Sequence, residues 1–173
     1  MLKSVLIGAV ALTLAGCATV DVANYKAERP PLDLAEYFNG RVDGWGMFQD
    51  RSGKVVRRFT VRIDAKWDGN RGTLDEHFEF SDGEKQNRIW TLVKDGDRYT
   101  GTAGDVVGTG QGIQQGNAFN MRYVLRVPWA GRTIDVDMDD WMWRIDDQTV
   151  LNRTAMTKFG FRVGEVTLSL RKR

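Results

Sequence analysis

The sequence predicts an all-β fold, an antiparallel up-and-down meander of eight to ten strands closed into a small barrel. Turn signals recur at short intervals, in a chain with 19 glycines against three prolines. Between the turns, apolar and polar side chains alternate with a period of two, and no stretch has βαβ spacing. Long strands in simple succession leave exposed edges unless the sheet closes on itself, so we expect a closed barrel.

Residues 1–16 have the features of a bacterial lipoprotein signal peptide. Lys3 supplies a positive start, and an apolar run too short to span a bilayer follows it. Leu14-Ala15-Gly16-Cys17 resembles the lipobox, which implies that Cys17 becomes the acylated first residue of the mature chain. Ala18 follows in place of aspartate, which resembles the pattern for sorting to the outer membrane. The alternative is a plain secretory signal with an incidental cysteine.

The anchor determines the expected location and partners. Two or more acyl chains give stable attachment, so we expect a protein on the inner leaflet of the outer membrane, facing the periplasm. Without residues 1–16 the chain has 24 basic and 23 acidic residues, a net charge of +1. This balance gives no case for nucleic-acid binding. The expected partners are the membrane and a lipid or fatty-acid-like ligand, while protein partners are left open.

Residues 17–31 are expected to be the lipidated cysteine and a non-periodic tether, followed by a single barrel domain over residues 32–173. The domain begins with Leu34, Tyr37 and Phe38 at i, i+3 and i+4, a spacing that predicts a short helix. This helix either plugs one end of the barrel or acts as a docking strap, and both roles stay open.

The strands follow from the alternation beyond the helix. Phe59, Val61 and Ile63 share one face of a long run, while Arg58 and Arg62 share the other. A barrel of this size holds only packed side chains or one small ligand, so the many charged side chains are expected to face water. The turn signals are Asp50-Arg51-Ser52-Gly53, Asp68-Gly69-Asn70, Asp82-Gly83, Asp95-Gly96, Gly116-Asn117, Ala130-Gly131 and Asp146-Asp147.

An inward carboxylate marks the candidate ligand site. Glu76 shares the apolar face of its strand with Phe78, where it needs a partner or a raised pKa. A three-residue turn over 81–83 pairs Glu76 with Arg88 and turns Trp90 inward, whereas a two-residue turn reverses the facing. We prefer the first. The pair either holds a lipid's acidic head group or only satisfies itself. The predicted lining is Arg88, Glu76, Trp90, Phe59 and Tyr123.

No catalytic or metal-binding pattern stands out, and the sequence predicts neither a cofactor nor a metal. Hydrolase motifs and a free mature thiol are absent. His77, the only histidine, faces outward beside two acids, which is a weak metal set. Residues 104–117 are glycine-rich but lack the helix and lysine of a phosphate loop, so they are interpreted as a flexible strand pair or a gap in the barrel. Asp139 and Asp140 point to opposite faces and cannot share a substrate.

Several motifs together resemble one family. They are Trp45-Gly46-Met47-Phe48-Gln49-Asp50, GTLDEHFEFSDG, RIWTL, DDWMW, Leu151-Asn152-Arg153 and KFGFRVGEVTLSLR. Over roughly residues 25–173 the chain is similar to bacterial lipoproteins of domain-of-unknown-function family 3833, a resemblance that implies no activity or catalytic residues. A looser likeness is to calycins, the lipocalin-like barrels. Gly44-Trp45 resembles their early tryptophan, and Arg171 would then cover that ring.

Three functions follow from these observations. The first is an anchored binding module whose barrel holds a hydrophobic or acidic-headed lipid. The second is a protein with a filled core that works through its tryptophan-bearing surface in an envelope complex. An enzyme acting on lipid or glycan comes last, because no set of side chains supports it.

Overall fold

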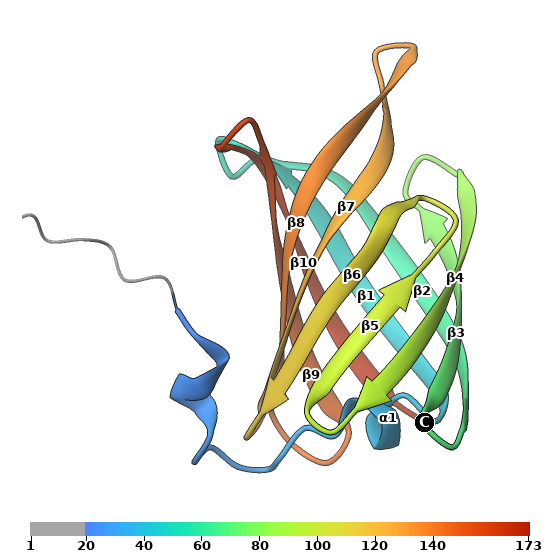
Figure 1. The fold of residues 1–173 in the computed structure, drawn as a ribbon. Coiled ribbons are helices and arrows are strands. Elements are labelled where there is room, and N and C mark those ends of the chain that lie inside the picture. The colour runs from blue at the N-terminus through green and yellow to red at the C-terminus, as the bar shows by residue number, and fades with distance from the viewer. Residues whose placement is uncertain (1–19) are drawn as a thin grey trace, which may run out of the picture.

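The structure, a computed structural model, describes residues 20–173, which form one closed antiparallel barrel of ten strands (Figure 1). Each strand pairs with its neighbours in sequence, and β1 pairs with β10 to close the ring. The predicted meander is confirmed at the upper end of its strand count. The strands are β1 (Gly40–Asp50), β2 (Val55–Asp68), β3 (Arg71–Phe80), β4 (Lys85–Asp95), β5 (Arg98–Thr102), β6 (Val106–Gln115), β7 (Ala118–Trp129), β8 (Arg132–Arg144), β9 (Thr149–Lys158) and β10 (Phe161–Lys172).

The predicted signal peptide, Cys17 and Ala18 lie outside the described residues. Within the described part of the chain, neither helix has the length and apolar character needed to cross a membrane.

The period-two pattern separates the inside of the barrel from the outside. On β2, Phe59, Val61 and Ile63 are 3–6% exposed. Arg58 and Arg62, which alternate with them, are exposed. Because successive side chains of a strand point to opposite faces, the apolar set fills the interior and the charged set meets water. The expected orientation of this strand is confirmed.

The predicted short helix is α1 (Leu34–Tyr37), and it closes one end of the barrel (Figure 1). The Asp33 side chain caps it by accepting hydrogen bonds from the backbone N–H groups of Ala35 and Glu36. Leu34, Tyr37 and Phe38 are each 2% exposed. The Tyr37 hydroxyl donates to the carbonyl oxygens of Gln148 and Leu170, at 2.9 and 3.1 Å. Of the two roles left open for this helix, the structure shows the plug.

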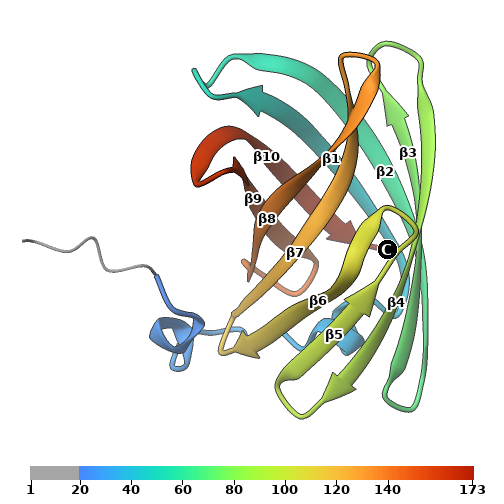
Figure 2. The ribbon, with the colours of Figure 1, turned by 45° about the horizontal axis from the view of Figure 1, so that its top comes forward.

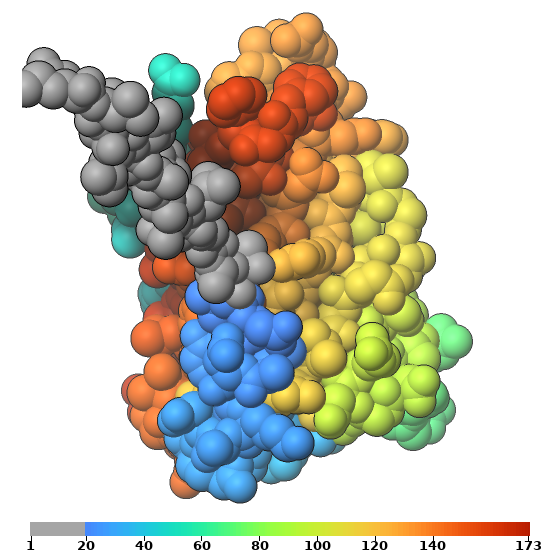
Figure 3. Space-filling model, turned by 60° about the vertical axis from the view of Figure 1, so that its left-hand side comes forward, coloured from blue at the N-terminus to red at the C-terminus, as the bar shows by residue number. Residues whose placement is uncertain are grey.

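The stretch expected to be a tether differs from that expectation over its described part. Residues 20–31 lie against the outer wall of the barrel, where Figure 3 shows them in blue. A one-turn helix, η1 (Val22–Tyr25), buries Val22 to 5% exposure beside Trp141. Tyr25 packs on Trp141 and Trp143, with ring centroids 5.9 and 6.2 Å away. These outward tryptophans supply an apolar surface, and we call residues 20–31 the strap.

The barrel wall has one place where the ladder of hydrogen bonds is incomplete. β5 is short, so it pairs with β4 only over Thr91–Asp95 and with β6 only over residues 110–113. Residues 85–90 of β4 and 106–107 of β6 therefore have a ladder partner on one side only, and residues 108–109 have none. This confirms the interpretation of residues 104–117 as containing a gap in the barrel.

The predicted pairing of Trp45 with Arg171 is wrong. Trp45 points outward and is 48% exposed, because Gly44 and Gly46 on either side of it face the packed interior. The guanidinium nearest its ring is that of Arg173, 5.9 Å from the centroid, while Arg171 donates to the side chain of Gln148. The barrel is lipocalin-like in shape, but this tryptophan lies outside it.

Candidate ligand cavity

The barrel holds a cavity of about 140 Å³ that extends from Leu34 and Phe38 at the α1 end to Phe48, Phe59 and Phe78 in the opposite half. Its wall is mostly apolar and is drawn from nearly every strand. All five residues predicted to line a ligand site do line it: Phe59, Glu76, Arg88, Trp90 and Tyr123. An apolar cavity of about 150 Å³ is known to hold benzene. The space therefore suits a small ring or a short stretch of acyl chain, and a whole lipid does not fit.

The turn between β3 and β4 sets which side chains face this cavity. It is the three-residue turn over 81–83, with Gly83 at φ +87° and its N–H donating to the Phe80 carbonyl. Only a residue without a side chain adopts that backbone conformation freely. The turn pairs Glu76 with Arg88 and Leu74 with Trp90 across the strands. The preferred register is confirmed, and the opposite facing is excluded.

Arg88 is held by a carboxylate that sequence reasoning missed. Its Nε lies 3.0 Å from both carboxylate oxygens of Asp105, and its Nη2 lies 2.8 Å from Oδ2. Asp105 belongs to the β5–β6 turn, so the ion pair spans the incomplete ladder between β4 and β6. Such two-pronged pairs are strong and fix orientation. Arg88 is therefore already paired along its Nε–Nη2 edge, while its Nη1 has no hydrogen-bond partner among the described residues.

Glu76 is the least satisfied polar group in the cavity. Its closest cation is Arg88, with Nη1 3.7 Å from Oε2, and the Glu76 carboxylate has no hydrogen bond to any residue that the structure describes. The side chain is only 14% exposed. Burial raises the pKa of Glu76 to about 7, against the opposing effect of the Arg88 charge. Near neutral pH this group can accept or donate a hydrogen bond.

Asp140 completes the polar end of the cavity. It accepts hydrogen bonds from Asn152 and from the Tyr123 hydroxyl, the latter at 3.3 Å. Burial raises the pKa of Asp140 to about 6, and the hydrogen bonds partly oppose this rise. Sequence reasoning set Asp140 aside, although the alternation of Met138 and Met142 with outward residues places it on the inner face. The opposite facing of Asp139 and Asp140 is confirmed, since Asp139 pairs outward with Arg122.

The polar end of the cavity is thus rich in acceptors. Three carboxylates, those of Glu76, Asp105 and Asp140, face a single cation, Arg88. The apolar part is aromatic: Trp90 lies edge-on to Tyr123, with centroids 5.2 Å apart. An enclosed apolar space with a few convergent polar groups is the usual form of a small-molecule site.

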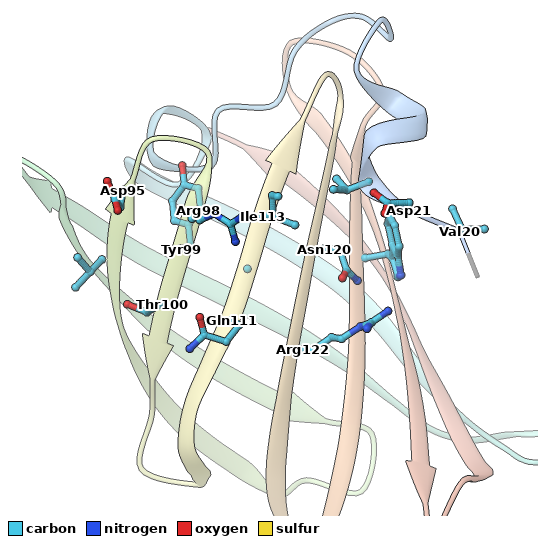
Figure 4. Close-up of a pocket in the computed structure, with 14 residues that line it drawn as sticks. Val20, Asp21, Asp95, Arg98, Tyr99, Thr100, Gln111, Ile113, Asn120 and Arg122 are labelled. Atoms are coloured by element: carbon cyan, nitrogen blue, oxygen red, sulfur yellow. The ribbon is translucent and has the colours of Figure 1, made fainter. Parts of the chain in front are cut away.

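A larger hollow of about 660 Å³ lies outside the barrel, beside the strap (Figure 4). Arg98, Gln111, Asn120 and Arg122 reach it from three strands, β5, β6 and β7, and Figure 4 shows these side chains spread along the outer surface. They do not converge on a common point. We take the smaller enclosed cavity as the candidate site, because it combines shape with convergent chemistry.

The sole histidine forms no cluster of metal ligands. His77 Nε2 lies 3.3 Å from Asp75, while Glu79 is bonded to Lys85 at 2.8 Å. Among residues 20–173, no group of three or more side chains is arranged to hold a metal ion.

Comparison with known families gives one assignment. The model of the DUF3833 family, described as a protein of unknown function, matches residues 11–172. The chain belongs to this family. No curated protein matches this DUF3833 chain.

Two solved structures resemble this DUF3833 protein in fold. One is a protein of unknown function from the DUF3598 family of Nostoc punctiforme, with a TM-score of 0.61 and 16% identity over 85% of this chain. The DUF3833 chain spans about half of it, 51% of its length. The other is the S-type phycobiliprotein lyase CPES of Guillardia theta, with a TM-score of 0.59 and 12% identity over 84% of this chain and 94% of the lyase. At these identities the likeness shows the barrel fold alone.

Proposed function

We propose that this DUF3833 protein is a lipid-anchored envelope protein whose barrel binds a small hydrophobic ligand carrying a hydrogen-bond donor, such as an amine or a hydroxyl group. The observation that carries the proposal is the Glu76 carboxylate, buried beside an apolar cavity without a hydrogen-bond donor among the described residues. A buried polar group without a partner is costly, and a ligand donor removes that cost.

The charges of the cavity favour a donor over an acid. The Arg88 guanidinium is already bound to Asp105, so an incoming carboxylate would face Glu76 and Asp140 without a free cation. An amine or hydroxyl placed near Glu76 gains an acceptor, while its apolar part occupies the space beside Trp90 and Phe59. The ligand is therefore amphipathic and small, or it is the end of a longer chain.

The gap between β4 and β6 offers an entry route. Backbone hydrogen bonds do not close this part of the wall, and the Arg88–Asp105 ion pair spans it. The pair takes the place of the missing ladder here, so a ligand that enters by this route has to part it.

The anchor belongs to the same proposal. The lipobox-like sequence before Cys17 supports acylation, an outer-membrane location and a periplasmic barrel. Val20, where the strap begins, is three residue steps from Cys17, and these steps span at most about 11 Å. The barrel would then lie against the bilayer rather than at the end of a long tether.

The proposal is tested with three six-carbon probes on a chain that begins at Ala18. Calorimetric titration should show 1-hexanol and hexylamine binding with Kd values of roughly millimolar, and hexanoate binding at least about tenfold more weakly. Glu76→Gln should remove the preference for hexylamine over hexanoate. The matched control is Glu79→Gln, which lies outward on the same strand and should leave binding unchanged.

A second pair of variants tests the place of binding. Val166→Phe adds a ring to the cavity wall and should abolish binding of all three probes. Leu151→Phe adds the same ring on the exposed outer face of β9 and should not. Binding that survives Val166→Phe, or no binding of any probe, would contradict the proposal and favour the filled-core interaction protein.

A further inference from the structure

The end of the barrel opposite α1, where the β1–β2, β7–β8 and β9–β10 turns lie (Figure 2), carries the most exposed apolar side chains of the described chain. Phe159, Phe161 and Trp129 are 85, 76 and 61% exposed. They belong to the β9–β10 and β7–β8 turns, and the valines around the β1–β2 turn add to them. The exposed apolar residues of these three turns are Val55, Val56, Trp129, Phe159, Phe161 and Val163. Exposed aromatic groups of this size usually mark an interaction surface.

The three turns are neighbours on one side of the barrel mouth. The ring order β2-β1-β10-β9-β8-β7 places the β1–β2, β9–β10 and β7–β8 turns next to one another. We call their residues 51–56, 128–132 and 158–163 the cationic rim.

Charge divides the mouth of the barrel into two halves. The rim contains no acidic residue over its three ranges. It contains five basic residues: Arg51, Lys54, Arg132, Lys158 and Arg162. The two remaining turns at this end, residues 81–84 and 103–105, contain three acidic residues and no basic one. Within the described chain, three of the rim cations, Arg51, Lys54 and Arg132, have no acidic partner.

The backbone of the β9–β10 turn holds its aromatic side chain outward. Phe159 adopts φ +52°, a left-handed conformation that is unfavourable for a bulky side chain. With Gly160 at φ +79°, Phe159 forms a two-residue hairpin turn in which both central residues have positive φ, as Ala130 and Gly131 do in the β7–β8 turn. The turn leaves the Phe159 ring almost fully exposed.

We propose that the cationic rim docks on an anionic phospholipid bilayer, with the barrel tilted so that its acidic turns stay in water. Aromatic side chains favour the headgroup region of a membrane, and lysine and arginine are attracted to anionic lipid at its surface. The rim presents both on one side of the mouth. The strap lies on β6 and β7 at the α1 end of the barrel, where Tyr25 lies against Gly116 of the β6–β7 turn, so the chain reaches the wall away from the rim. This inference stands apart from the cavity ligand.

The test measures depth at single sites, so that anchoring by the N-terminus does not decide it. The full chain with Cys17→Ser carries one new cysteine, Phe161→Cys or the control Ser81→Cys in an acidic turn, labelled with the fluorophore NBD. Each is added to phosphatidylcholine vesicles with or without phosphatidylglycerol, containing doxyl-labelled lipid as quencher. Both positions are exposed, so neither change disturbs the core, and circular dichroism checks the fold.

The expected result is quenching at position 161 on phosphatidylglycerol vesicles, several-fold stronger than at position 81. It should fall several-fold without phosphatidylglycerol, in high salt, or with Arg132→Gln, Lys158→Gln and Arg162→Gln combined. Equal quenching at both positions, or none at 161, overturns the proposal. Protection of the 161 label only by added envelope proteins, without lipid quenching, also overturns it and points to a protein partner.

Discussion

Glu76, Arg88 and Asp140 show how individual residues give the barrel its chemistry. A strand side chain that points inward must be satisfied inside, and here Arg88 is satisfied by Asp105 rather than by its cross-strand partner Glu76. Glu76 is left with a distant cation and a pKa raised to about 7 by burial. The consequence is a carboxyl group whose charge is unfavourable in the folded protein.

This shift makes a prediction about stability and pH. Below pH 4.5, the ordinary pKa of the group, Glu76 is protonated in both the folded and the unfolded chain. As the pH rises toward about 7, the unfolded chain releases the proton first, so folding binds a proton and the folded state loses stability. Above that range the whole penalty, roughly 2–3 kcal/mol, is present.

Glu76→Gln removes this titration. The free energy of unfolding of the variant, measured by urea denaturation, should rise relative to wild type by roughly 2 kcal/mol between about pH 5 and pH 8. Glu79→Gln, on the outer face of the same strand, serves as the control and should show no such rise. A constant difference between the Glu76→Gln variant and wild type across this range would show that Glu76 has no raised pKa.

At the scale of elements, the plug helix α1 and the strap differ in how well the sequence predicts them. The helix α1 shows a helical spacing of apolar residues, so it could be predicted, and only its placement could not. The strap has no periodicity, and its helix η1 is a single turn. It is held by Trp141 and Trp143, outward residues on β8 that are distant in the sequence. Nothing local to residues 20–31 indicates this contact.

Gly116 offers a direct test of how the strap is held against the barrel. A Cβ at Gly116 would lie 1.7 Å from the Tyr25 carbonyl oxygen, and the residue has φ +55°. Gly116→Ala should therefore displace the strap and open the Lys26–Ala27 bond to trypsin, with a loss of stability beyond the roughly 1–2 kcal/mol that left-handed backbone alone costs.

The matched control is Gly131→Ala. Gly131 has φ +77° but nothing within 4 Å of its Cβ position, so this variant should lose only the backbone term and resist trypsin at the strap. Equal cleavage of both variants, or of neither, would show that Gly116 does not hold the strap in place.

For the whole molecule, alternation and turns carry most of the fold. A period of two, with short turns, leaves little choice but a meander, and the cost of open edges makes it close. The five predicted lining residues meet because one turn, 81–83, sets the register of β3 and β4. Sequence reasoning missed Asp105, because its contact with Arg88 depends on the short β5 and the gap beside it. The absence of a ladder partner produces no recognisable pattern in the local sequence.

The proposed membrane contact also bears on the source of the cavity ligand. The cationic rim would hold one side of the barrel mouth at the lipid surface, and the gap between β4 and β6 opens at the same mouth, on the side of the acidic turns. A ligand with an apolar body and a donor group is most available in such a place, among membrane lipids and their fragments.

The most direct measurement is mass spectrometry of what the protein carries when it is purified from the cells that naturally make it. Organic extraction should release one amphipathic species with an amine or hydroxyl group, in stoichiometric amount from wild type and absent from Val166→Phe. An extract that contains only bulk membrane lipids, in the same proportions for both forms, would contradict the account.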